Sequence, residues 1–238
     1  MNWRAIPYDL KQLKGDPMLL ISLMVPFILW VLMYLVYPIV EHAVLKQWNL
    51  DISPYYSQAG IFLLMLIPMM MGMVYGFILL DERDAGVITA ISVTPTGKTG
   101  YLVLRMGIPM VLSFVLIMLY LILLRLSGSL NLLQLILISM VMSAQSLILL
   151  LILGAFAGNK VMGMAITKGS GLLLIGPLLD YGLPAPYKWM GAFSPLFWAS
   201  RTLLAETPGS IWLYCGITFL FQLLVIWILF RKFKARSD

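Results

Sequence analysis

Residues 59–80 read AGIFLLMLIPMMMGMVYGFILL and contain no charged side chain. About 20 helical residues cross the roughly 30 Å of hydrocarbon in a bilayer, so this run predicts a membrane-spanning helix. Comparable apolar runs lie at 18–40, 106–124, 131–157, 161–179 and 211–230. The sequence therefore predicts an all-α, polytopic membrane protein with six transmembrane helices.

The composition excludes a soluble globule. Hydrophobic residues make up 61% of the chain and charged residues 11%, against about 25% charged residues in soluble domains. The six runs leave no room for a separate soluble catalytic domain, so residues 1–238 are expected to form a single domain. A disulfide scaffold is excluded because Cys215 is the one cysteine.

The basic residues predict how the chain is oriented. If the amino terminus is cytoplasmic, the Lys and Arg residues fall mostly on the inner side, as the positive-inside rule requires. The residues left outside are Lys46, Arg125, Lys188 and Arg201. We therefore expect a multi-pass protein of the inner (plasma) membrane with both termini cytoplasmic. The net charge of +6 then reflects orientation, and no nucleic-acid partner is expected.

The segments outside the runs predict interfacial structure. Residues 1–16 place apolar side chains at helical spacing, which indicates an N-terminal interfacial helix or an ordinary basic flank. Residues 41–58 are polar and are expected to be an outer connector. Residues 181–210 combine aromatic residues with prolines, which predicts one or two short re-entrant helices in the outer leaflet. The glycine-rich fifth run, 161–179, is expected to pack against protein.

The stretch 81–94 reads DERDAGVITAISVT, and its first four residues place three acids around Arg83. Val87, Ile88 and Ile91 follow at helical spacing, which predicts a short cytosolic amphipathic helix at 83–93. Such a helix could lie on the membrane surface or dock a soluble partner. An acidic cluster gains nothing from an anionic leaflet, which favours a protein partner.

The later string TGKT at 96–99 ends like a phosphate-binding loop, but Ser92 stands where that motif needs a glycine. We therefore expect no ATPase site and no bound cofactor in this chain. His42 is the sole histidine, so neither a metal cluster nor a Ser-His pair can be assembled from it.

Several strings follow one another in a specific order: Asp81-Glu82-Arg83-Asp84-Ala85-Gly86, then Thr94-Pro95, Arg105 and Ser194-Pro195-Leu196-Phe197-Trp198. This order resembles the permease subunit of type-2 ABC exporters, with Val87 where that family often has Thr. The resemblance implies a homodimer, or a heterodimer with a similar permease, driven by two separate ATPase subunits that hold ATP and Mg. It implies that coupling to the ATPase depends on Glu82, Arg83, Asp84, Gly86, Val87, Ile88 and Ile91.

Methionines crowd the second run, and flexible thioethers suit a wall that accepts varied apolar ligands. The alternative for each is lipid contact or core filling. In the resembled family the second and fifth spans line the path, which implies Met69, Met73, Met162 and Met164 as path residues. Lys168 is the one charge inside a proposed span, and is either functional or extended towards the interface.

The substrate is expected to be apolar or amphipathic: a drug, a lipid-linked molecule or an antimicrobial peptide. One alternative is a membrane-embedded, lipid-modifying transferase, for which only Asp81, Glu82 and Asp84 supply clustered acids. Another is an accessory or immunity membrane protein that transports nothing, which would have no need of a coupling loop.

Overall fold

The computed structural model describes residues 16–92, 97–124, 126, 130–205 and 207–237, and these residues form helices and no strand. Six helical rods are long and apolar enough to cross a membrane, which confirms the predicted spans. The rods comprise α2 (Pro17–Val31), the π-helical turn η1 (Leu32–Val36) and α3 (Tyr37–Trp48); η2 (Ser53–Tyr55) and α4 (Tyr56–Asp84); α6 (Gly97–Leu123); α7 (Leu132–Ser143) and α8 (Gln145–Phe156); α9 (Lys160–Ser170), η3 (Gly171–Leu174) and α10 (Ile175–Gly182); and α12 (Pro208–Ser237).

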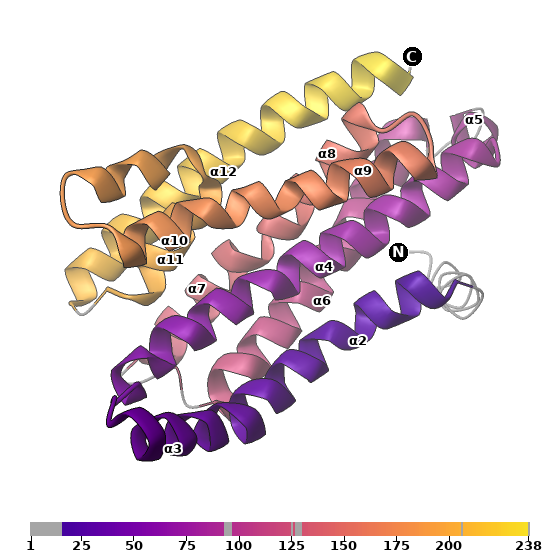
Figure 1. Cartoon of the computed structure of the whole chain (residues 1–238). Coiled ribbons are helices and arrows are strands. Elements are labelled where there is room, and N and C mark those ends of the chain that lie inside the picture. The colour runs from indigo at the N-terminus through magenta and orange to yellow at the C-terminus, as the bar shows by residue number, and fades with distance from the viewer. Residues whose placement is uncertain (1–15, 93–96, 125, 127–129, 206, 238) are drawn as a thin grey trace.

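Successive rods run in opposite directions, so their connections gather at two ends of the bundle (Figure 1). The short helix α5 (Val87–Ser92), the α8–α9 connection and the end of α12 lie at one end, here called the α5 end. The opposite end, the α3 end, carries α3, the start of α12 and the short helices η4 (Tyr187–Phe193) and α11 (Pro195–Leu203).

The second rod is the centre of the bundle, since α4 contacts α2, α6, α8 and α9. Its closest neighbour is α8, and glycine permits that approach: a Cβ added at Gly72 would lie 2.3 Å from the carbonyl oxygen of Ser146. Small residues drive helix association in membranes in this way, because backbones can come into contact.

Two clusters of buried side chains fill the bundle. The cluster in the α3 half includes Leu29, Ile61 and Tyr120, and the cluster in the α5 half includes Phe77, Leu102 and Phe233. Each cluster joins side chains from at least four rods. The clusters therefore hold both ends of the bundle together.

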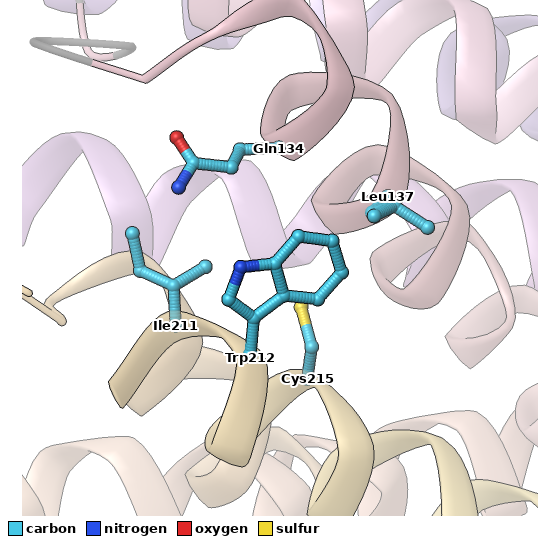
Figure 2. Close-up of a pocket in the computed structure, with 5 residues that line it drawn as sticks. All are labelled: Gln134, Leu137, Ile211, Trp212 and Cys215. Carbon is cyan, nitrogen blue, oxygen red and sulfur yellow. The ribbon is translucent and has the colours of Figure 1, made fainter. Parts of the chain in front are cut away.

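The contact of α7 with α12 shows how closely the rods pack. Figure 2 shows Ile211, Trp212 and Cys215 of α12 facing Gln134 and Leu137 of α7. The space between them holds no water-sized void. This seam is therefore packing and not a binding site.

The first rod is longer than predicted. Residues 41–48 were expected in the outer connector but continue the helix, which ends where Asn49 adopts a left-handed conformation (φ 53°). Polar residues do not end a helix unless the backbone turns, and Asn is among the few residues that take this conformation readily.

Three other expectations have different outcomes. The segment 181–210 does contain short helices, η4 and α11, whose insertion into a leaflet stays a prediction. The fifth rod, which was expected to pack against protein, contacts α4 and α8 but is little covered within this single chain, because 17% of its apolar window is buried. The predicted N-terminal interfacial helix lies outside the described residues, apart from Asp16.

Candidate functional site

The chain reverses direction at the α5 end in the turn between α4 and α5. The amide of Ala85 donates to the carbonyl of Asp81 (2.9 Å) and that of Gly86 to the carbonyl of Arg83 (3.0 Å). Gly86 has a φ of 72°, a conformation that side chains disfavour. This glycine separates the two helices, so the predicted helix at 83–93 is wrong in its start: Arg83 and Asp84 end α4, and α5 begins at Val87.

Glu82, in the last turn of α4, forms a buried ion pair with α6. Its carboxylate accepts from Arg105 Nε (2.9 Å) and Nη2 (2.5 Å), and the hydroxyl of Tyr101 donates to the same group. Glu82 is 7% exposed and Arg105 is 3% exposed. A two-point Arg–carboxylate contact is directional as well as strong, so it fixes α4 against α6.

Arg83 reaches the opposite neighbour. Its Nη2 donates to the carbonyl of Ala157 (2.6 Å) and its Nη1 to that of Gly154 (3.3 Å). The last carbonyls of a helix have no partner within the helix and carry partial negative charge. Arg83 therefore caps the end of α8.

Asp81 connects the turn to the start of the fifth rod. Lys160, the first residue of α9, lies 3.1 Å from Asp81 Oδ2 and 2.6 Å from Oδ2 of Asp16, just before α2. Asp81, Glu82 and Arg83 thus bond to α9, α6 and α8 in turn, and the Asp81–Lys160 contact extends to α2. We call these residues, with their partners Asp16, Tyr101, Arg105 and Lys160, the turn network.

The turn network changes the interpretation of the acidic cluster. The sequence analysis treated Asp81, Glu82 and Asp84 as charges facing a partner, but Glu82 is buried and paired, and Asp81 is paired with Lys160. Asp84 is the acid exposed here. Sequence reasoning did not identify Tyr101, Lys160 or Asp16, because their pairing depends on helices meeting far along the chain.

The apolar residues of α5 are only partly covered. The helix packs against α4 and α6. The side chains of Val87 and Ile91 are nevertheless partly exposed, and Ala90 is exposed. The side chain of Ile88 lies outside the described part of the structure. A short helix with apolar side chains therefore protrudes at the α5 end (Figure 1).

The five path candidates do not all come together. Met69 is 4% exposed and packs in the core, which favours core filling at that position. Met73 is partly buried on α4, whereas Met162, Met164 and Lys168 face outward from α9. The two helices do meet at Gly163 of α9, where an added Cβ would lie 2.9 Å from Phe77 and from Leu80.

A second set of charges lies at the α3 end, between the fifth and sixth rods. Arg201 of α11 lies 2.6 Å from Asp180 of α10, and its guanidinium is 4.2 Å from the centre of the Trp189 ring. Burial lowers the pKa of Arg201, but its hydrogen bonds to Asp180 outweigh this and leave the pKa raised. Arg201, an exception to the positive-inside distribution, is thus neutralised locally by an acid.

Comparison with known proteins identifies the chain. Residues 9–230 match the family described as "Fluoroquinolones export permease protein Rv2686c-like". The chain belongs to this family of export permeases. It therefore is a multi-pass ABC exporter permease of type 2, which confirms the resemblance drawn from the motifs.

Two relatives of this permease come from Mycobacterium tuberculosis. They are the "Fluoroquinolones export permease protein Rv2686c" of strain ATCC 25618 / H37Rv and the "Fluoroquinolones export permease protein MT2760" of strain CDC 1551 / Oshkosh. Each is 27% identical over 234 residues, covering 96% of this permease and 92% of the relative. No solved structure matches this permease.

Proposed function

We propose that this permease exports amphipathic drugs across the plasma membrane, driven by two separate ATPase subunits that dock at α5. The observation that carries this proposal is the turn network. A partner that displaces α5 pulls on residues 81–83, which bond to three rods besides α4 and reach the start of α2. ATP and Mg are bound by the ATPase subunits, and this chain holds no cofactor.

The coupling step follows from the bonds at the turn. Val87 and Ile91, with Ile88, supply the apolar surface for the ATPase, and Asp84 lies exposed beside them. Movement of α5 passes through Gly86 to Arg83 and Glu82. From there it reaches the end of α8 and the start of α6 as rigid-body shifts, because both contacts are charged and directional. Alternating access results when these rods tilt together.

The α5 end is proposed to face the cytosol, with both termini inside. This orientation is supported by basic residues near the helix ends that lie there: Arg83 of α4, Arg105 of α6, Lys160 of α9, and Arg231, Lys232 and Lys234 of α12. The opposite end then lies outside, where η4 and α11 rest in the outer leaflet.

The transport path is proposed to form between two permease copies, or between this permease and a similar one. The support is the largely uncovered α9, which exposes Met162 and Met164 and also the charged Lys168. A charged side chain within a span is costly in hydrocarbon and marks a substrate route or a protein contact. Met73 extends this surface onto α4.

A planar drug is the proposed substrate, in preference to a lipid-linked molecule or a peptide. The support is the printed name of the two relatives, which are fluoroquinolone export permeases. A wall of thioethers adapts to flat apolar rings without a fixed shape.

The coupling proposal can be tested with charge placed on α5. Co-expression with the cognate ATPase subunit should yield a complex that exports a fluorescent fluoroquinolone from proteoliposomes with ATP. Val87→Asp combined with Ile91→Asp should lower co-purified ATPase at least about tenfold, because each buried aliphatic side chain contributes about 1.5–3 kcal/mol.

The matched control is Leu45→Asp combined with Leu50→Asp, which adds the same two charges at exposed positions of the α3 end. It should leave both the complex and export unchanged. Wild-type co-purification of the ATPase with the α5 variant, with unchanged substrate-stimulated hydrolysis, would show that α5 lies on the membrane surface instead.

A further inference from the structure

A hollow of about 620 Å³ opens on the side of the bundle, between the first three rods. It is lined by Trp30, Tyr34, Tyr56, Leu123 and Leu124. Small-molecule sites are typically clefts of about 300–1,000 Å³ lined by apolar and aromatic side chains. We call this cleft the aromatic hollow, and it has the size and lining of such a site.

The rings of the aromatic hollow are arranged as flat surfaces. Trp30 and Tyr34 stack with centroids 5.6 Å apart and planes 15° apart. Tyr56 meets Tyr37 edge to face at 5.1 Å, and the hydroxyl of Tyr37 is anchored on the carbonyl of Ile52 (2.7 Å). Aromatic rings attract a further ring by offset stacking, so the hollow favours a planar ligand.

The backbone of one wall is unusual. Tyr34 lies in the π-helical turn η1, which joins α2 to α3. Such turns are rare and occur frequently at functional sites. Trp30 lies four residues before Tyr34, in α2, and the two side chains share one face of the rod, where their rings stack.

Two hydrogen-bond groups beside the hollow lack partners. Within the described residues, neither Trp30 Nε1 nor the hydroxyl of Tyr120 is hydrogen-bonded, although both atoms are buried. Tyr120 is 3% exposed, packs in the same cluster as Leu124 and lies one turn before it on α6. An unsatisfied buried donor is unfavourable, so an oxygen brought near these groups would be held there. The hydrocarbon of a lipid chain offers no such oxygen.

We propose that the aromatic hollow binds a planar aromatic molecule that carries a carbonyl or carboxylate oxygen. The ring stacks against Trp30 and Tyr34, and the oxygen accepts from the indole of Trp30 and from Tyr120 after a small side-chain rotation. None of the lining residues belongs to α9. The hollow is therefore separate from the path proposed above, and the two proposals can fail independently.

Binding to the purified full-length permease in lipid nanodiscs, without any ATPase, tests this site. The probe is a fluorescent fluoroquinolone, whose planar ring system carries both a carbonyl oxygen and a carboxylate. Trp30→Leu and, separately, Tyr34→Leu should weaken binding at least about tenfold. Trp48→Leu and Tyr55→Leu remove the same rings from exposed positions outside the hollow and should leave the affinity unchanged.

Equal affinities for the hollow variants and their controls would overturn the proposal. Tyr34 is 57% exposed, so its loss does not threaten folding, and the Tyr34→Leu result stands even if Trp30→Leu fails to fold. Because the binding assay contains no ATPase, a failure of the proposed ATP-driven transport cannot change the measured affinity.

The hydrogen bonds and the lipid alternative are tested separately. Tyr120→Phe should lower the affinity for the fluoroquinolone about threefold to tenfold. It should leave the affinity for anthracene, a planar ring system without oxygen, unchanged. In nanodiscs with brominated acyl chains, benzoate, a planar ring with a carboxylate that does not absorb tryptophan emission, should relieve the quenching of Trp30 fluorescence in a variant whose other tryptophans are replaced. Persistent quenching at saturating benzoate would show that a lipid chain occupies the hollow and would overturn the proposal.

Discussion

Charged side chains gather at both ends of this permease, and the two groups differ in the parts of the chain that they join. At the α5 end, Lys160 bonds Asp16 and Asp81, which lie 144 and 79 residues away in sequence. At the α3 end, Arg201 bonds Asp180, which is 21 residues away and lies at the end of the fifth rod, directly before the segment that holds α11. The first group joins rods that are far apart in sequence, whereas the second holds the end of one rod to a short helix that follows it. The proposed coupling therefore assigns transmission of motion to the α5 end, and only local stabilisation to the α3 end.

The buried pair of the turn network should give the largest effect on stability. Glu82→Ala leaves the guanidinium of Arg105 buried without its partner, which should cost about 3–5 kcal/mol of the free energy of unfolding. Asp84→Ala removes an exposed acid two residues away and should change it by less than about 0.5 kcal/mol. Denaturant unfolding in micelles gives both values.

A charge exchange sharpens this result. Glu82→Arg with Arg105→Glu should recover part of the loss, because the pair is restored with its sign reversed. If Glu82→Ala costs no more than Asp84→Ala, the turn network does not hold α4 to α6, and the contrast between the two ends has no basis.

Variants of Arg83 and Arg201 should distinguish an effect on stability from an effect on coupling. Arg83→Ala and Arg201→Ala each remove charged hydrogen bonds, and each should cost about 1.5–3 kcal/mol of the free energy of unfolding. Of these two variants, Arg83→Ala alone should raise the ratio of ATP hydrolysed to substrate exported, because Arg83, unlike Arg201, connects the α4–α5 turn to another rod. An equal rise for Arg201→Ala would mean that the α3 end takes part in coupling too.

The smallest effect should come from the backbone of the turn. An added Cβ meets nothing within 4 Å at either Gly86 or Gly107, so the two positions differ only in conformation. Gly86→Ala should cost about 1–2 kcal/mol because its φ is 72°. Gly107→Ala lies within α6 and should stabilise by up to about 1 kcal/mol. Thermal unfolding should therefore shift in opposite directions, and shifts of the same sign would exclude a strained turn.

The six spans could be predicted because hydrocarbon thickness sets the length of an apolar run, and that length is visible in the sequence. Helix ends were less predictable. The polar residues after Val40 suggested a connector, yet the helix ends only at Asn49, where the backbone turns. The polar character of these residues does not show which of them adopts the left-handed conformation and so ends the helix.

The candidate site was predictable only in part. The motif predicted a short helix after the second span, but neither the turn at Gly86 that separates this helix from α4 nor the burial of Glu82. A continuous helical pattern hides the turn, and an acidic run suggests exposure. The environment of Glu82 depends on Arg105 and Tyr101 one rod later. The contact of Lys160 with Asp16 depends on the folded arrangement of the first and fifth rods, which no local pattern encodes.

Cys215, the one cysteine of the chain, lies in the seam between α7 and α12 and is buried there. Thiol reagents react with exposed thiolates, and a thiol enclosed by apolar neighbours is inert. Maleimides and thiol-reactive spin labels should therefore label the native Cys215 only slowly. Single cysteines placed on α5, on α9 or beside the aromatic hollow can be labelled without first removing the native one, so the α7–α12 packing stays intact during the measurement.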